Sequence, residues 1–327
     1  MSITGQKASS NQEFSQQDAQ AAIQIAALPQ AYERELQRSG DHDAALKTML
    51  ESAPRALQND INLLRMDNTT AVAVYDSENR SLTITFDPTL DKGTVFNNAD
   101  KWDNFNRGEE PHSLGGEVHG GLYDDLVKDA DGQLPGDNLV DVLTGIIHDC
   151  ASRDGSDLKV NFVGFSKGGA QTALAAGEVI STGLFDDNPN IKLNDLYTFG
   201  TPGYGNQDYI HTLNEKIGEL GANAWSVELH GDAVPTVLTQ DAGSYFTKYE
   251  YSQMGNHAYI TANENGMDVY LNPDHDKLTE LRTQPRSEQS QHSTNAYSNA
   301  VDNLNNNGTE EIMSTQPVQT NTTTLSI

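Results

Sequence analysis

The sequence predicts an α/β fold in which a mostly parallel central sheet is flanked by helices. Three observations predict it. A short apolar run over residues 158–165 leads through the turn Gly-x-Ser-x-Gly into a helix of small residues that reaches residue 177. Strand-like and helix-like stretches then alternate as far as residue 235. Upstream, residues 70–88 hold two β-rich runs around a polar turn, which is typical of a hairpin.

Composition divides the 327 residues into four parts. Apolar residues at helical spacing between Asp18 and Ala53 predict a helical extension ahead of the main domain. Polar residues dominate both ends of the chain, and the C-terminal end is rich in Ser, Thr, Asn and Gln, which is typical of disorder. We therefore expect a disordered N-terminus over 1–16, a helical extension over 17–66, a main domain over 67–282 and a disordered tail over 283–327.

Three further stretches complete the main domain. Residues 90–117 are rich in Asn, Asp and Gly and predict a long loop, of the kind that often forms a lid. Residues 138–150 place apolar side chains on one helical stripe. Cys150 lies on that stripe and is the one cysteine of the chain, so we expect a core residue and no intrachain disulfide. Two further strands are expected, one within LNDLYTFGTPGYGN and one within AWSVELHGDAVP. A helix over 205–220 is expected between them.

The formal net charge of −27 argues against nucleic acid as a partner and against electrostatic docking on anionic membranes. No apolar run approaches the ~20 residues that span a bilayer. The N-terminal stretch has no apolar segment of the kind found in a conventional signal peptide. The default expectation is therefore a cytoplasmic protein. Export by a specialised secretion system that reads the tail is the alternative, and no protein partner is indicated.

Ser166 is the candidate nucleophile. It lies between Gly164 and Gly168, directly after an apolar strand, in a turn that lifts a serine hydroxyl clear at the C-terminal edge of a sheet. A serine becomes nucleophilic when a base takes its proton and an acid orients that base. Asp232 follows a predicted strand and His257 comes later, so the chain order is serine, acid, histidine. A turn aspartate and a surface histidine are the alternatives, but order and placement together favour catalysis.

Four histidines compete for the role of base. His257 follows a Gly-Asn turn and precedes apolar residues that can anchor it, so we expect it to be the base. His275 is flanked by two aspartates in a polar stretch, which is typical of a solvated loop. His292 falls in the predicted disordered tail and is not expected to be fixed. His119 precedes the serine in the chain and is a weaker rival.

No cofactor or metal is predicted. Residues 128–138 resemble a calcium loop, but they lack an acid at the first position and have Asn138 where the bidentate Glu belongs. The Asp-His-Asp triplets at 41–43 and 274–276 could offer ligands. Adjacent residues do not converge on one ion, so a surface role is expected for both.

Five stretches in order resemble the class 3 lipase family, which consists of α/β-hydrolases. They lie between Thr70 and Ile260 and read LTITFDPT, EVHGGLYDDL, VGFSKGGAQTAL, LYTFGTPGYGN and HGDAVPTV. The resemblance implies an α/β-hydrolase fold and a serine hydrolase acting on carboxylic esters of lipids, of lipase or phospholipase A type. It implies Ser166 as nucleophile, Asp232 as acid and His257 as base, and a lipid or small ester as substrate.

The resemblance also implies an oxyanion hole formed by the backbone N–H groups of Lys167 and Thr89. Here the chain departs from the family pattern, since it has Asp87–Pro88 where the family usually has Arg-Gly. Proline has no N–H to donate. Phe165 also replaces the usual histidine before the nucleophile. The altered Asp87–Pro88 turn supports the alternative of a catalytically dead hydrolase fold used as an interaction module, and a serine amidase or peptidase is a third hypothesis.

Overall fold

An eight-stranded sheet forms the centre of the protein. In the computed structural model its strand order is β1-β2-β3-β6-β7-β8-β9-β10. The strands β3, β6, β7, β8 and β9 pair in parallel, and antiparallel pairs close both edges. This confirms the predicted α/β fold with a mostly parallel sheet. The strands are β1 Ile61–Arg65, β2 Thr70–Asp76, β3 Ser81–Phe86, β6 Leu158–Phe165, β7 Ile191–Phe199, β8 Asn223–Leu229, β9 Asn256–Asn263 and β10 Gly266–Leu271. The structure describes residues 13–57, 60–65, 69–88, 108–127, 139–153, 155–236, 251–264, 266–284 and 291–304.

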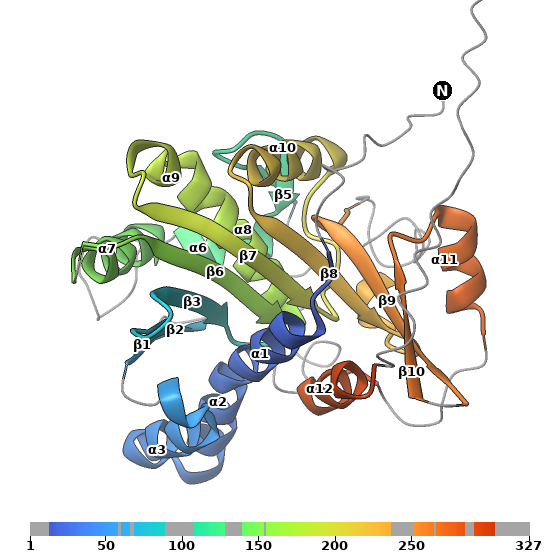
Figure 1. Cartoon of the computed structure of the whole chain (residues 1–327), viewed down its shortest axis with the longest axis horizontal. Helices are drawn as coiled ribbons and strands as arrows, with labels where there is room; N and C mark the ends of the chain where they lie inside the picture. Colours follow the sequence, from blue (N-terminus) through green and yellow to red (C-terminus); the bar gives the residue numbers. More distant parts are fainter. Residues whose placement is uncertain are drawn as a thin grey trace, which may run out of the picture.

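Helices cover both faces of this sheet (Figure 1). One face carries α6, α7, α8, α9 and α10, and the other carries α1, α2 and α12. The helices are α1 Gln16–Ala26, α2 Leu28–Ser39, α3 His42–Ser52, α6 Gly120–Val127, α7 Leu139–Ser152, α8 Lys167–Ser181, α9 Leu184–Asp187, α10 Gln207–Glu219, α11 His275–Arg282 and α12 Thr294–Asp302, with 3-10 turns at Arg55–Leu57 and Val234–Thr236. None of the described helices is both long enough and apolar enough to cross a membrane.

Two apolar cores lie on the two faces of the sheet. In β8, Ala224 packs on the side of α8 and α10, whereas Trp225, Val227 and Leu229 pack on the side of α1 and α12. This alternation follows from the period of two along a strand. Cys150 is buried in the first core, as its position on the apolar stripe of α7 predicts.

The N-terminal extension forms three helices and one strand. Ser15 caps α1 by accepting the Asp18 N–H at 3.1 Å, and α2 ends at Gly40, which adopts a left-handed φ of 67°. The expectation of a helical extension over 17–66 is wrong for its last part, because residues 61–65 form the edge strand β1. Apolar and polar residues mix irregularly there, and pairing with β2 stabilises the strand.

The disordered tail expected over 283–327 differs from the structure at residues 291–304, whereas residues 285–290 and 305–327 lie outside the described residues. Residues 291–304 are ordered around α12, in which Tyr297 and Val301 are buried against the second core. Ser293 caps this helix by accepting the Ala296 N–H at 3.1 Å. Composition predicted disorder because a few apolar residues at helical spacing are outnumbered by Ser, Asn and Gln. Four apolar side chains are nevertheless sufficient to dock one face of a short helix.

The predicted loop over 90–117 is described only in its last part, since residues 89–107 lie outside the described residues. From residue 108 the chain forms a small hairpin instead of a loop, with β4 Glu109–Pro111 paired to β5 Glu117–His119. His112, in the turn of this hairpin, lies with its Nε2 3.2 Å from Glu178 Oε1 on α8. The Tyr123 hydroxyl of α6 donates to the same oxygen, so the hairpin and α6 both contact Glu178 of α8.

Candidate active site

Ser166 occupies the sharp turn between β6 and α8. Its own backbone carries the strain of the turn, with φ of 57° and ψ of −132°. A Cβ on Gly168 would lie 2.2 Å from the Phe86 oxygen, and one on Gly164 would lie 2.5 Å from Thr172 Oγ1. The two glycines therefore permit the close approach of α8 to β3 and β6, and this fixes the serine at the C-terminal end of β6.

His292 is the histidine that reaches this serine. Its Nε2 lies 2.8 Å from Ser166 Oγ, and its Nδ1 lies 2.8 Å from Asp232 Oδ2. The Asp232 carboxylate accepts hydrogen bonds, so Nδ1 carries the hydrogen and Nε2 accepts from the serine hydroxyl. The imidazole stacks on the Phe165 ring, with ring centroids 4.7 Å apart and planes at 29°. The histidine is thus oriented for proton transfer from Ser166.

Asp232 is buried, and each of its carboxylate oxygens accepts a hydrogen bond. Oδ1 accepts the Val234 N–H at 2.9 Å, and Oδ2 accepts the Tyr297 hydroxyl at 2.8 Å besides His292. Burial, together with the charge of Asp232, raises the pKa of Tyr297 well above its ordinary value. The tyrosine therefore stays protonated and keeps donating. A Cβ on Gly200 would lie 2.7 Å from Oδ2, so only glycine leaves room for this carboxylate.

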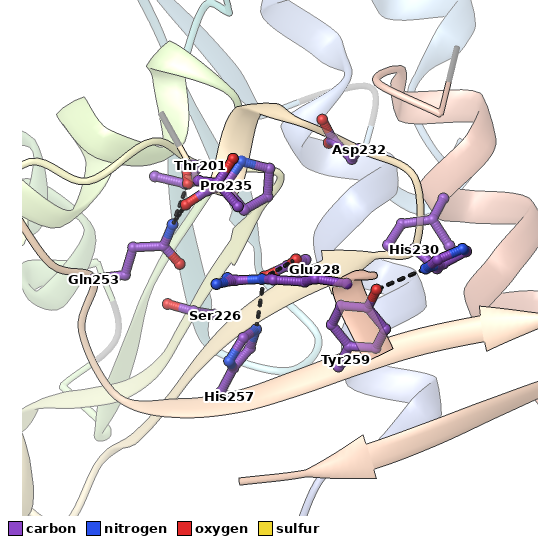
Figure 2. A network of polar contacts seen from close by, with 12 residues as sticks. Thr201, Ser226, Glu228, His230, Asp232, Pro235, Gln253, His257 and Tyr259 are labelled. Atoms are coloured by element: carbon purple, nitrogen blue, oxygen red, sulfur yellow. Dashed lines mark hydrogen bonds and ion pairs between the residues drawn. The ribbon is translucent and has the colours of Figure 1, made fainter. Parts of the chain in front are cut away.

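The expectation that His257 approaches Ser166 is wrong. His257 is the second residue of β9, and its neighbour Ala258 packs in the same core as Tyr297. Because side chains alternate across a strand, His257 lies on the opposite face of the sheet. Its Nε2 is 3.3 Å from Glu228 Oε2, and Figure 2 shows it directed at Glu228, with Asp232 apart from this pair.

Glu228 holds this second cluster together. Arg282 on α11 donates two hydrogen bonds to its carboxylate, from Nε to Oε1 at 2.9 Å and from Nη2 to Oε2 at 2.6 Å. Burial, the largest influence, raises the pKa of Glu228, but the hydrogen bonds and charges of His257 and Arg282 together outweigh it and hold the pKa below its ordinary value. His257 therefore belongs to a cluster with Glu228 and Arg282 on this face of the sheet.

Sequence reasoning missed His292 because it followed composition instead of periodicity. A helix signal does exist directly after the histidine. Ser293 is a strong N-cap residue, and Tyr297, Ala300 and Val301 recur at helical spacing. That pattern would have predicted an anchored helix, with His292 fixed at its start.

Further hydrogen bonds fix the loops that surround the site (Figure 2). The Gln253 side chain donates to the backbone oxygens of Thr201 and Pro235, the latter at 3.0 Å. This bridge joins the loop after β7 to the loop that carries the acid. His230 Nδ1 lies 2.7 Å from the Tyr259 hydroxyl and ties the start of the acid loop to β9.

The structure describes one of the two predicted oxyanion donors. Lys167 is the first residue of α8, where backbone N–H groups face outward from the helix N-terminus. Thr89 lies outside the described residues. Asp87, just before it, is anchored, since its Oδ1 accepts the Thr69 hydroxyl and the Thr70 N–H, each at 3.0 Å. The Asp-Pro turn is therefore fixed at the end of β3.

The other residues considered as a base or as metal ligands have structural roles. His119 is buried on β5, where its Nδ1 accepts the Leu122 N–H at 3.3 Å. Asp41 and Asp274 each cap a helix, α3 and α11, with their side chains. Within the described part of the chain, no group of three or more His, Cys, Asp and Glu side chains could hold a metal ion. Residues 128–138, which resemble a calcium loop, lie outside the described residues.

An elbow serine at the end of a parallel strand, followed in the chain by an acid and a histidine that meet it at that edge, defines the α/β-hydrolase class. Within this class, residues 85–242 match the family model described as lipase (class 3), and this segment belongs to the class 3 lipase family. Membership of this family indicates a carboxylic-ester hydrolase that acts on lipids. No curated protein matches the chain in sequence.

Solved structures of fungal lipases are similar to the chain in fold. A lipase from Rhizopus microsporus var. chinensis is 17% identical, with 88% of this chain and 85% of that chain covered and a TM-score of 0.52. The Rhizomucor miehei triacylglyceride lipase is 16% identical, with 87% and 94% covered and a TM-score of 0.53. A triacylglycerol lipase described as having a serine protease triad at its catalytic centre is 15% identical, with 86% and 92% covered and a TM-score of 0.55. At these identities the likeness shows the fold alone.

Proposed function

We propose that the protein hydrolyses carboxylic esters of lipids through a triad of Ser166, His292 and Asp232. The observation that carries the proposal is the position of the His292 imidazole, which lies 2.8 Å from both the serine oxygen and the carboxylate oxygen. The class 3 lipase match supports the substrate class. The similar triacylglycerol lipase that is described as having a serine protease triad at its catalytic centre supports the mechanism.

In the proposed reaction, Ser166 Oγ attacks the ester carbonyl carbon while His292 Nε2 takes the hydroxyl proton. The buried charge of Asp232 stabilises the imidazolium that forms. The carbonyl oxygen becomes an oxyanion that faces the Lys167 N–H, with Thr89 as the proposed second donor. The C–O bond to the alcohol breaks as His292 returns the proton to it. Water then attacks the acyl-enzyme in the same way and releases the carboxylic acid, so the steps use only this chain and water.

The test compares the wild-type protein with Ser166→Ala on p-nitrophenyl esters, triglyceride emulsions, phospholipid vesicles and peptides. We expect ester hydrolysis by the wild-type protein and a fall of several orders of magnitude, about 10⁴-fold or more, in the variant. Faster hydrolysis of triglyceride emulsions would indicate a lipase, and faster hydrolysis of phospholipid vesicles would indicate a phospholipase A. Cleavage of peptides alone would indicate an amidase.

The alternative of a catalytically dead interaction module predicts a different result. It predicts no difference between the two proteins and no covalent labelling of Ser166 by a fluorophosphonate. The Asp87–Pro88 turn is its support, whereas the contact between His292 and Ser166 argues against it.

A further inference from the structure

The segment that carries the proposed base makes several of its hydrogen bonds with the N-terminal helices. We term residues 291–304 the base segment. The Gln16 Nε2 group on α1 donates to the backbone oxygen of Val301 at 2.7 Å. The Gln20 Nε2 group, one turn further along α1, donates to Ser298 Oγ at 2.9 Å. Two glutamines of one helix thus hold the middle and the end of α12.

A third glutamine holds the start of α12, next to the proposed base. Thr294 Oγ1 donates to Gln30 Oε1 of α2 at 3.2 Å, and both residues are buried. Thr294 is the first residue of α12 and lies two positions after His292. A buried hydroxyl without an acceptor costs free energy, so this contact favours one placement of the first turn of α12.

Two further contacts of the base segment lie further from the imidazole along the chain. The Tyr297 hydroxyl accepts the Leu229 N–H at 3.1 Å, and the Asn303 oxygen accepts the Met267 N–H at 3.0 Å. These contacts fix the middle and the far end of α12. The Thr294–Gln30 contact, by comparison, links the first turn of α12 to α2.

We propose that the N-terminal extension is a positioning element for the base, with Gln30 as its positioning residue. The inference rests on the proposed function, since it assigns His292 the role of base. Both partners of the contact lie outside residues 85–242, the segment matched by the family model. By fixing Thr294, Gln30 lets the imidazole meet Ser166 and Asp232 at the same time. A displacement of about 1 Å at such a position can cost about 100-fold in rate.

The test uses the full chain with Gln30→Met and Thr294→Val, which remove the acceptor and the donor while keeping the size of the side chain. Thr294→Ser restores the hydroxyl. Gln37→Met is the matched control, because Gln37 is exposed on the same helix α2. Two quantities are measured: kcat and KM on a p-nitrophenyl ester, and the far-downfield NMR signal of the His292 Nδ1 proton, identified by its absence from His292→Gln.

We expect Gln30→Met and Thr294→Val to lose about 10- to 100-fold in kcat with KM unchanged, and to lose or broaden the downfield signal. Thr294→Ser and Gln37→Met should keep both. Wild-type kcat and an intact signal in a folded Gln30→Met or Thr294→Val would overturn the inference. Absence of the signal from the wild-type protein would also overturn it. A wild-type protein that shows the signal but hydrolyses no ester contradicts the proposed function alone, and the NMR comparison then decides the inference.

Discussion

Ser166, the proposed nucleophile, has a strained backbone conformation. A φ of 57° is uncommon outside glycine, and the surrounding packing must therefore stabilise it. That packing comes from α8, which approaches β3 so closely that a side chain at Gly168 would meet the Phe86 backbone. The glycines of the motif thus fix the position of the serine by allowing close packing, and they do not have a positive φ themselves.

Replacing the proposed base gives the sharpest prediction for a single residue. His292→Ala should lower kcat/KM for ester hydrolysis by about 10⁴-fold or more, since no other described histidine hydrogen-bonds to Ser166. It should also abolish labelling of Ser166 by a fluorophosphonate. Initial rates and mass spectrometry of the labelled protein measure the two effects.

His257→Gln is the matched comparison for that experiment. His257 contacts Glu228 on the other face of the sheet, and Arg282 still holds this carboxylate when the imidazole is removed. We expect its kcat/KM to stay within about threefold of the wild-type value, because the triad contacts are unchanged. An inactive His257→Gln beside an active His292→Ala would reverse the assignment of the base.

At the scale of elements, the short helix α12 positions two residues of the candidate site. The N-terminal end of α12 carries His292, and its next turn carries Tyr297, which donates to Asp232. The proposed base and a hydrogen-bond donor to the proposed acid are therefore placed together when α12 docks on the sheet. The neighbouring strands β8 and β9 contribute Leu229 and Ala258 to the same apolar core as Tyr297.

The ion cluster on the other face of β8 predicts how stability depends on pH. Because the folded-state pKa of Glu228 is below its ordinary value of 4.5, its stabilisation is fully present above pH 4.5 and is lost as the pH falls through the folded-state pKa. Glu228→Gln should lower the free energy of unfolding by about 3 kcal/mol at pH 7, since Arg282 loses its buried partner. The difference from the wild-type protein should shrink toward pH 3.

Urea unfolding followed by circular dichroism across this pH range measures that difference. Glu51→Gln is the control, because Glu51 and Lys47 form an exposed pair at 3.8 Å. Such a pair contributes little, so the change should stay below about 1 kcal/mol at any pH. A Glu228→Gln deficit that is constant between pH 7 and 3 would contradict the lowered pKa.

At the scale of the whole molecule, the fold depends on segments from both ends of the sequence. The extension and the base segment meet on one face of the sheet, where α1 lies beside α12 (Figure 1). A chain that ends after Leu304 keeps every contact described for this face and should retain ester hydrolysis within about threefold. A chain that ends after residue 284 loses the proposed base and exposes the rings of Phe165 and Phe199, which pack edge-on against Tyr297 of α12.

We expect this shorter chain to be inactive, to unfold at a lower temperature and to aggregate. Esterase assays, thermal unfolding and light scattering on the two truncated chains test these expectations. Full activity in the chain that ends after residue 284 would exclude His292 as the base. Inactivity of the chain that ends after Leu304 would show that the site needs residues beyond the base segment.

The sequence by itself determined the parts of this protein that are encoded locally. The alternation of strands and helices predicted the sheet, and the run from residue 158 to 177 predicted the strand, elbow and helix around Ser166, since period, glycines and apolar runs are local properties. Asp232 was also found, because it directly follows a strand. Only the tertiary structure decided between His257 and His292. The direction of each imidazole depends on where the strand or helix next to it lies in the fold. The docking of α12 depends on contacts with α1, α2 and β8, which are far from α12 in the sequence.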